Sequence, residues 1–212
     1  FKFRYYFDRM FPEDLLNKIQ MDEVASFSVT ESKFADDISK KILNTKGISS
    51  KMTITDATAC IGGNSISFCK YFSHVNMIEI NQKRTKMLRH NINVCFKHKT
   101  FGKNMKATYK IFNGDYLTVL KENKDIKKDI IFFDPPWGGL DYKKHNSLMP
   151  VINNDTMTDI VNNMCENYKF KYVVLKLPIN FDIENFSIHK SQILYNENFS
   201  NKKGKEKLKL II

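Results

Sequence analysis

The chain has 212 residues, with 34 lysines and arginines against 23 aspartates and glutamates, and a net charge of +11. This length fits one domain with a hydrophobic core, or one domain with an extension. The positive charge and the 13% aromatic content favour a nucleic acid as partner. A membrane partner is disfavoured, because no apolar run approaches the ~18 residues of a membrane span.

The cysteines and histidines do not form a metal-binding pattern. The four cysteines, at positions 60, 69, 95 and 165, contain no C-x-x-C pair, and the five histidines stand at no metal-type spacing from them. We therefore expect reduced thiols, an intracellular protein and no bound metal. No signal peptide is visible, and because the chain begins at Phe1 rather than at a methionine, we expect further sequence outside it.

Strand and helix patterns alternate from about residue 50, after a first part with helical patterns only. In that first part we predict helices over Pro12–Gln20 and Glu31–Leu43, the second capped by Thr30. From there strands and helices alternate, and the chain closes with an antiparallel pair of strands. The predicted elements are Lys51–Asp56, Asn64–Phe72, His74–Ile80, Gln82–Phe96, Lys106–Phe112, Tyr116–Asn123, Asp129–Phe133, Asp155–Phe170, Lys171–Leu177, Gln192–Phe199 and Lys205–Ile212.

This alternation predicts the fold class. Strands that alternate with helices indicate an α/β fold with a mostly parallel sheet and right-handed crossovers. Ligands of such sheets bind at the carboxyl ends of the strands. We expect a helical N-terminal extension over residues 1–49 and a Rossmann-like domain over residues 50–212.

The most informative residues follow the predicted strand 129–133 and read Asp134-Pro135-Pro136-Trp137-Gly138-Gly139. The prolines fix the backbone, and with it the direction of the carbonyl before the aromatic residue. That carbonyl and the Asp134 side chain can then accept both protons of one exocyclic amine, while Trp137 offers a face for a base. Such a loop is typical of enzymes that present a base amine to a methyl donor. The alternative is a Pro-Pro turn with a half-buried Trp137.

Three earlier strand ends carry residues suited to a nucleoside cofactor. The small-residue turn 56–64 allows a backbone to pass close to a ligand. Glu79 ends the next strand, where a carboxylate can accept from both hydroxyls of a ribose. Asp115 follows the third strand, where an adenine amino group would lie. The chain has neither a Walker lysine pattern nor a dinucleotide fingerprint, so S-adenosylmethionine is favoured over ATP or NAD. Taken singly, the aspartates could be cap or turn residues and Glu79 a solvated charge.

These motifs resemble those of the trimethylguanosine synthase family, class I methyltransferases that act on N2 of the 7-methylguanosine cap of RNA. The family loop D-A-F-C-G-x-G-G-N is similar to residues 56–64, and S-P-P-W-G-G-x-x-Y is matched by residues 135–139 and Tyr142. Residues 27–31 resemble F-S-V-T-P-E, residues 177–180 resemble L-P-R-N, and residues 197–199 resemble Q-N-F. The resemblance runs over nearly the whole chain.

The resemblance implies a class I methyltransferase fold with an antiparallel last strand, and methyl transfer to guanine N2 that gives 2,7-dimethylguanosine or 2,2,7-trimethylguanosine. It implies capped RNA as partner, and we expect a monomer in the nucleus or cytoplasm, or in a virus. Expected catalytic residues are Asp134, Pro135, Pro136 and Trp137. Expected S-adenosylmethionine ligands are Thr30, Asp56, Ala57, Gly62, Asn64, Glu79, Asp115 and Asp134. Expected cap ligands are Trp137, Tyr142, Pro178 and Asn180.

Three positions depart from the family pattern. Asp134 stands where the family has serine, Cys60 where it has glycine, and Ile179 where it has an arginine suited to the cap phosphates. Because D-P-P-W is also the loop of RNA N6-adenine methyltransferases, an adenine in RNA or DNA stays open as substrate. A side chain at Cys60 could crowd the cofactor, which leaves a noncatalytic cap-binding protein as a further alternative. Further candidates for contacts with the cap phosphates are Lys2, Arg4, Lys143 and Lys144.

The aspartate fits guanine better than adenine. Guanine presents N1–H and N2–H₂ side by side, so one carboxylate can accept from both, whereas adenine N1 would direct a lone pair at it. Stacking of a positively charged 7-methylguanine on Trp137 would add ~0.5–2 kcal/mol over stacking of a neutral base. His145, close to the loop, could also take the proton that the amine releases, although a surface histidine is the simpler interpretation.

Overall fold

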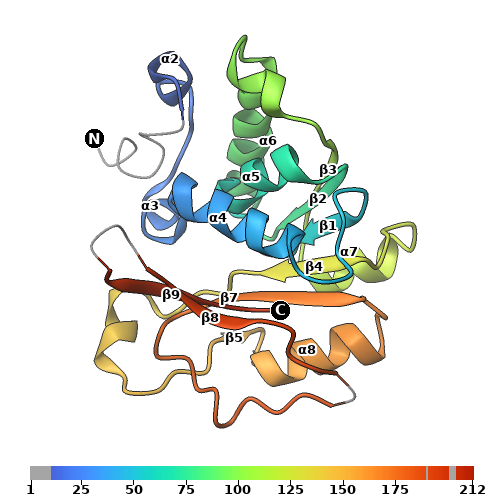
Figure 1. The fold of residues 1–212 in the computed structure, drawn as a ribbon. Coiled ribbons are helices and arrows are strands. Elements are labelled where there is room, and N and C mark those ends of the chain that lie inside the picture. Colours follow the sequence, from blue (N-terminus) through green and yellow to red (C-terminus); the bar gives the residue numbers. More distant parts are fainter. Residues whose placement is uncertain (1–10, 190, 201–203) are drawn as a thin grey trace. The chain divides into compact units, whose positions relative to one another are not determined.

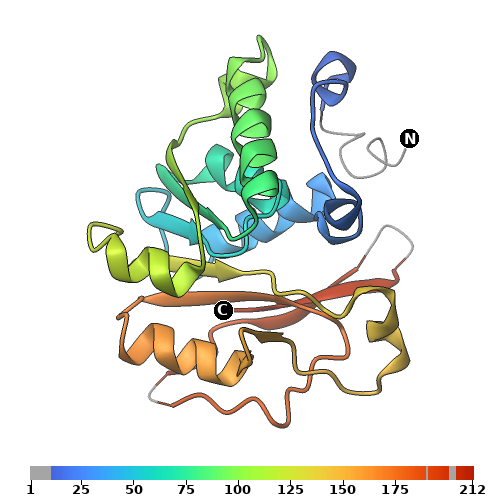
Figure 2. The same cartoon turned by 180° about the vertical axis from the view of Figure 1, so that it is seen from behind.

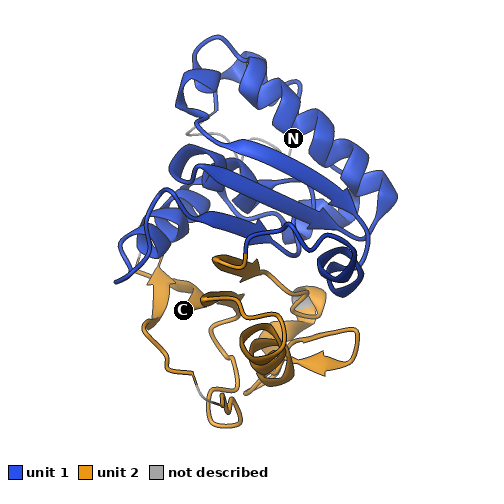
Figure 3. Ribbon diagram, turned by 90° about the vertical axis from the view of Figure 1, so that its right-hand side faces the viewer, with its two compact units in different colours: residues 1–127 blue, residues 128–212 orange. Residues whose placement is uncertain are grey.

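The computed structural model describes residues 11–189, 191–200 and 204–212. Contacts divide the chain into two compact units, residues 1–127 and 128–212 (Figure 3). The strand order is β3-β2-β1-β4-β7-β9-β8. The expected helical extension over residues 1–49 stays a prediction as a domain of its own.

Over its described residues, 11–127, the first unit contains three strands and a series of helices, which Figure 1 labels. Its strands are β1 (Thr53–Asp56), β2 (His74–Glu79) and β3 (Thr108–Asn113). Its helices are α2 (Glu13–Leu16), α3 (Glu23–Ser28), α4 (Ser32–Leu43), α5 (Gly63–Tyr71), α6 (Gln82–Lys97), the 3-10 helix η1 (Phe101–Asn104) and α7 (Tyr116–Glu122). All three strands are parallel, with Asp56 opposite Met77 and Glu79 opposite Asn113. Their carboxyl ends therefore share one edge, as the alternation predicted.

Within the residues described, the second unit contains four strands of the main sheet and a small hairpin. The bounds are β4 (Ile130–Phe133), the 3-10 helix η2 (Gly139–Lys144), β5 (Val151–Ile152), β6 (Asp155–Thr156), α8 (Met157–Glu166), β7 (Tyr172–Leu177), β8 (Asn196–Ser200) and β9 (Glu206–Ile211). Strands β4 and β7 are parallel, whereas β9 pairs antiparallel with both β7 and β8. The predicted antiparallel close of the chain is confirmed.

Apolar faces explain where the helices lie. Strand β4 is buried at every residue. Helix α6 packs on β2 and β3 (Figure 2), and its residues Leu88 and Ile92 are fully buried. In the second unit α8 packs on β7. No helix within the residues described is long and apolar enough to cross a membrane.

The predictions for residues 51–133 are confirmed within a few residues, whereas those for the N-terminal part need correction. The helix predicted over Pro12–Gln20 is the four-residue α2, and the short α3 was not predicted. Asp22 caps α3 by accepting from the backbone N–H of Ala25 at 2.8 Å. Thr30 does not cap α4: the N-cap position is Glu31, which makes no side-chain capping bond.

Two boundaries in the second unit also differ from the prediction. Helix α8 spans Met157–Glu166 rather than Asp155–Phe170, because Asp155 and Thr156 belong to β6 and Thr156 forms a capping box with Asp159. Strand β8 begins at Asn196 rather than at Gln192. The hairpin of β5 and β6 was not predicted, since two-residue strands leave no periodic pattern.

A buried carboxylate joins α4 to α5. Asp36 accepts from the hydroxyl of Ser67 at 2.7 Å and from Nζ of Lys70 at 3.0 Å, and the side chains of Asp36 and Lys70 are 8% and 12% exposed. Beside them the hydroxyls of Ser39 and Ser67 lie 2.7 Å apart. Burial together with the Asp36 charge raises the pKa of Tyr71 to about 12. This network fixes α4 on α5, the helix that follows the loop after β1 (residues 57–62).

Replacing Asp36 should therefore destabilise the protein strongly. Asp36→Ala leaves the Lys70 ammonium buried without its partner, and we expect a loss of about 3–5 kcal/mol in the free energy of unfolding. Asp37→Ala is the matched control, because Asp37 pairs with Lys33 at the surface at 2.6 Å and should cost at most about 1 kcal/mol. Urea denaturation of both variants measures the difference. Equal losses would show that the buried network does not hold α4 in place.

Candidate active site

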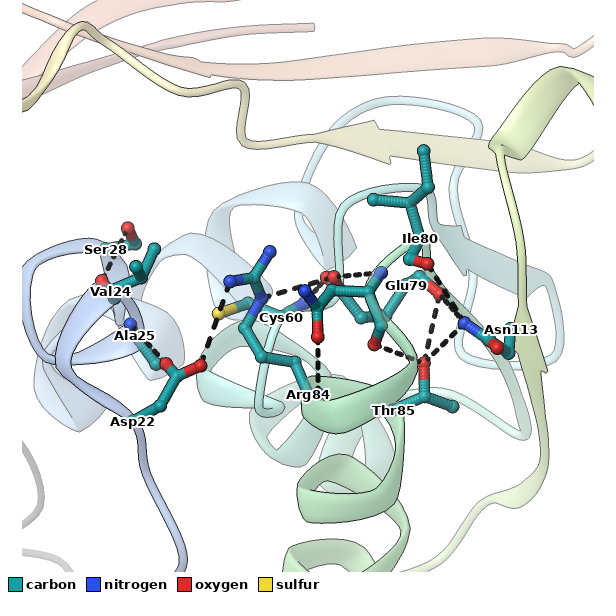
Figure 4. Close-up of polar contacts among 11 residues, drawn as sticks. Asp22, Val24, Ala25, Ser28, Cys60, Glu79, Ile80, Arg84, Thr85 and Asn113 are labelled. Carbon is teal, nitrogen blue, oxygen red and sulfur yellow. Dashed lines mark hydrogen bonds and ion pairs between the residues drawn. The ribbon is translucent and has the colours of Figure 1, made fainter.

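In the first unit the carboxylate of Glu79 joins the first loop to the end of β2 (Figure 4). Oε2 accepts from the backbone N–H of Cys60 at 3.0 Å, and Oε1 accepts from the backbone N–H of Asn81 at 2.8 Å. Nε of Arg84 donates to Oε1 at 3.3 Å. The glutamate predicted for a ribose is thus 6% exposed and held in one orientation by three donors.

Arg84 extends this junction to the N-terminal segment, and sequence reasoning missed it. Its Nη1 lies 3.8 Å from Oδ2 of Asp22, the N-cap residue of α3 (Figure 4). Arg84 stands in the first turn of α6, so the spacing from Glu79 is local and could have suggested the contact. Asp22 lies too far away in the sequence for any pattern to pair it with Arg84.

The turn at the end of β3 reaches the same edge. The side-chain amide of Asn113 donates to the carbonyls of Glu79 and Ile80 at 2.9 and 3.1 Å (Figure 4). The backbone N–H of Gly114 donates to the carbonyl of Glu79 at 3.1 Å. Asp115 follows and caps α7, accepting from the backbone N–H groups of Leu117 and Thr118. The cap role is therefore present, and an adenine contact stays a prediction.

The loop after β1 approaches the N-terminal segment closely. Gly62 has a φ of +102°, and Gly63 begins α5. A Cβ at Gly63 would lie 2.7 Å from Cγ2 of Val29 and 3.1 Å from the backbone nitrogen of Thr30. Only glycine fits there, so the F-S-V-T segment and the loop are packed backbone against backbone.

Cys60 adopts the conformation expected of the glycine that it replaces. Its φ is +50°, in the left-handed region that side chains disfavour, and its N–H points to Glu79. Burial, with a smaller effect of the Glu79 charge, raises the pKa of the Cys60 thiol to about 12. Cys60 therefore has a backbone conformation that glycine adopts without strain.

The remaining predicted cofactor residues of the first loop are buried. Asp56 accepts from the hydroxyl of Ser65 at 2.6 Å and from the backbone N–H of Thr58 at 3.3 Å, which holds the turn together. Ala57, Asn64 and Thr30 are all less than 9% exposed. The structure thus brings these residues to one edge of the sheet, and their contact with a cofactor stays a prediction.

In the second unit the loop after β4 contains an ion pair that the sequence did not reveal. Nζ of Lys176, in β7, lies 2.7 Å from Oδ2 of Asp134, and the two side chains are 7% and 11% exposed. The same ammonium lies 4.8 Å from the centre of the Trp137 ring. Asp134 and Trp137 are therefore neighbours, as expected, and Lys176 is the third member of the group. Pro135 is buried and Pro136 is exposed.

Tyr142 and Asn180 complete the surroundings of Trp137. Tyr142 meets Trp137 edge to face, with ring centres 5.3 Å apart, and burial raises the pKa of its hydroxyl. The amide of Asn180 donates to the carbonyls of Tyr142 and His145 at 2.9 and 2.7 Å, which fixes η2 against the segment after Pro178. Among described residues, Nε1 of Trp137 and Oδ1 of Asn180 are buried atoms without a hydrogen-bond partner. A ligand at this place could use both.

The candidates for the cap phosphates have different positions. Lys143 lies 5.6 Å from the centre of the Tyr142 ring, and Lys144 pairs with Asp141 at 2.6 Å. Ile179 is 41% exposed, at the place where the family pattern has an arginine. Lys2 and Arg4 lie outside the described residues. Within the residues described, no three histidine, cysteine, aspartate or glutamate side chains are grouped as metal ligands.

Comparison with known sequences identifies relatives. The profile of the RNA cap guanine-N2 methyltransferase family matches residues 51–210. Protein L320 of Acanthamoeba polyphaga mimivirus is 36% identical over 136 residues, 64% of this chain and 50% of the relative. The trimethylguanosine synthase of Schizosaccharomyces pombe is 31% identical over 127 residues, 58% of this chain and 48% of the relative. The chain spans about half the length of these curated relatives.

Comparison with solved structures identifies the fold. The rRNA methyltransferase aviRa from Streptomyces viridochromogenes has a TM-score of 0.61 at 8% identity, over 96% of this chain and 92% of its own. A Porphyromonas gingivalis W83 protein, solved as a methyltransferase candidate, has a TM-score of 0.64 at 18% identity, over 91% of this chain and 43% of its own. The expected methyltransferase-like α/β fold is confirmed.

The raised pKa of Cys60 predicts an unreactive thiol. Because only the thiolate reacts with iodoacetamide, Cys60 should stay unmodified in the native protein at about pH 8, and its alkylation rate should rise about tenfold per pH unit toward its pKa. Cys165, which is partly exposed, is the internal reference in the same digest. Mass spectrometry of native and denatured samples measures both thiols. Native alkylation of Cys60 as fast as that of Cys165 would contradict the buried position of this side chain.

Proposed function

The chain belongs to the RNA cap guanine-N2 methyltransferase family, and from this premise we propose that it transfers a methyl group from S-adenosylmethionine to N2 of the 7-methylguanosine cap of RNA. The product is 2,7-dimethylguanosine and, after a second transfer, 2,2,7-trimethylguanosine. The observation that carries the proposal is the group of Asp134, Trp137, Tyr142 and Asn180, which combines a carboxylate acceptor with an aromatic platform in one unit.

The first unit fits a nucleoside cofactor. The two oxygens of a carboxylate offer about four acceptor positions, two on each oxygen. In Glu79, Oε1 accepts from Asn81 and Arg84, and Oε2 accepts from Cys60 alone among the contacts described. One position on Oε2 remains for a ribose hydroxyl. We propose that the cofactor site of the first unit is lined by Thr30, Asp56, Ala57, Gly62, Asn64, Glu79 and Asp115.

The loop after β4, residues 134–139, provides the groups that act on the base; we call it the acceptor loop. When bound, S-adenosylmethionine supplies an electrophilic methyl group that a nitrogen lone pair can attack. Asp134 and the carbonyl of Pro136 would accept the two amine protons and localise the N2 lone pair for this attack. The rigid Pro135-Pro136 segment holds both acceptors, and Trp137 stacks on the base. The proton lost from the methylated amine passes to Asp134 or to water.

The surroundings of Trp137 offer further contacts to the cap. Oδ1 of Asn180 can accept and Nε1 of Trp137 can donate, and each of these buried atoms would gain a partner from the nucleotide. Pro178 and Tyr142 would border the base, and the net positive charge of +11 would favour the RNA chain. We propose that a monomer acts on capped RNA where such RNA is present, in the nucleus, the cytoplasm or an infected cell.

Adenine N6 is the second candidate acceptor, and one observation favours it. The Lys176 ammonium beside Asp134 places a donor next to an acceptor, and adenine presents the complementary pair at N1 and N6. The lone pair of adenine N1 could then accept from Lys176 and would not have to face the carboxylate of Asp134. Side-chain exposure of only 7% at Lys176 and the family membership keep guanine N2 as the primary proposal.

Product analysis tests the proposal directly. The protein is incubated with S-adenosylmethionine and either a 7-methylguanosine cap analogue, an unmethylated cap analogue or an adenosine-containing RNA, and the products are read by mass spectrometry. We expect one or two methyl groups on N2 of the methylated analogue. Trp137→Ala should lose ~1–3 kcal/mol of cap affinity, as base stacking predicts, and retain cofactor binding. Methylation of adenosine alone would move the assignment to adenine N6.

A further inference from the structure

Lys176 is a buried cation in the acceptor loop region without an assigned role. It lies in β7, whose residues Val173 to Leu177 are all buried, and its Nζ contacts Asp134 at 2.7 Å. The contact follows from the parallel register: Phe133 is opposite Leu175, so the next residues, Asp134 and Lys176, lie side by side. A lysine is almost never buried unless it is paired, so this side chain is held there by a specific arrangement.

The ammonium acts on both groups that would recognise the base. It cancels the negative charge of Asp134, and at 4.8 Å from the ring centre it already supplies a cation to Trp137. An aromatic ring attracts cations through the electron density of its faces. A second cation on the same ring is repelled by the first and meets a ring that is already polarised toward it. Lys176 thus already makes the cation–π interaction with Trp137 that a positively charged base would make.

We propose that Lys176 is a specificity-determining residue, whose ammonium reduces the preference of this site for positively charged 7-methylguanine over neutral guanine. The inference rests on the proposed function, because it assumes that Trp137 stacks on guanine. It deepens that function by naming what sets the acceptance of unmethylated caps. A site with Trp137 and a neutral residue at position 176 would discriminate more strongly.

Substitutions at Asp134 and Lys176 change the local charge by one unit each. The variants can therefore be ranked by their expected preference for 7-methylguanine over guanine. Lys176→Met removes the ammonium and keeps the negative charge of Asp134, which attracts the charged base. The double variant Asp134→Ser with Lys176→Met has neither charge and frees the ring. Asp134→Ser leaves the ammonium alone, which repels the charged base. Discrimination in favour of 7-methylguanine should therefore be highest in Lys176→Met, then in the double variant, then in the wild type, and lowest in Asp134→Ser.

Trp137 gives a direct readout, because it is the only tryptophan of the chain. Its fluorescence quenching is titrated with 7-methyl-GTP and with GTP at mildly acidic pH, and the ratio of the two dissociation constants is compared between variants. Relative to the wild type we expect the ratio to rise about tenfold in Lys176→Met and about two- to fivefold in the double variant, and to fall about fivefold in Asp134→Ser.

The control removes a similar pair from the surface. Lys171 contacts Asp129 at 2.9 Å, and its side chain is 62% exposed, so Lys171→Met should leave the ratio unchanged. Removing one partner of a buried pair can prevent folding, whereas removing both is tolerated better. If a single variant does not fold, the double variant and the wild type decide.

The outcomes separate this proposal from the proposed function. A ratio that is the same in the wild type and the folded double variant, with both nucleotides still bound, would overturn the role of Lys176 and leave the cap function intact. If neither nucleotide quenches Trp137 in the wild type, the cap assignment itself fails, and the role of Lys176 fails with it.

Discussion

The carboxylate of Glu79 is the constraint on which the first unit depends. It receives the N–H of Cys60 from the loop after β1, the N–H of Asn81 from the start of α6, and the guanidinium of Arg84, which also reaches Asp22 at α3. A buried carboxylate with these partners fixes three segments at the carboxyl edge of the parallel strands. The position from which a ribose would be bound is therefore set by the fold before any ligand enters.

The second unit also contains a carboxylate that is paired with a cation at the end of a strand. Asp134 pairs with Lys176 as Glu79 pairs with Arg84, and in both places a cation contacts a largely buried carboxylate at the end of a strand. The two acids differ in what surrounds them. Glu79 accepts from the backbone N–H groups of Cys60 and Asn81, whereas Asp134 pairs with an ammonium that also lies over the ring of Trp137. In the proposed function, the carboxylate of the first unit accepts from the ribose of the cofactor, and that of the second unit accepts from the base.

The sequence predicted the elements whose signals are local. The β-branched run before Asp56, the apolar run before Asp134 and the turn residues after each were sufficient to place the strand ends, and the family resemblance supplied the residues around them. The contact of Arg84 with Glu79 is local in the sequence and could have been predicted. The contacts of Arg84 with Asp22 and of Lys176 with Asp134 could not, because Asp22 lies in another segment and Lys176 meets Asp134 only through the register of β4 and β7. Lys176, a lysine inside an apolar strand, was the sequence feature that could have indicated a buried ion pair. The error at Thr30 has a similar origin, since the backbone of Thr30 packs closely on Gly63, which is distant in the sequence, and the N-cap position of α4 is Glu31.

Calorimetric titration with S-adenosylmethionine tests the central claim that the Glu79 junction binds the cofactor. The wild type should bind, and Glu79→Gln should lose about 1.5–3 kcal/mol of affinity, because the amide cannot accept from all the donors around it. Glu122→Gln, which removes an exposed carboxylate of the same unit, should bind like the wild type. Thermal denaturation confirms that each variant is folded. Absence of binding by the wild type, or equal affinity of a folded Glu79→Gln protein, would contradict the account.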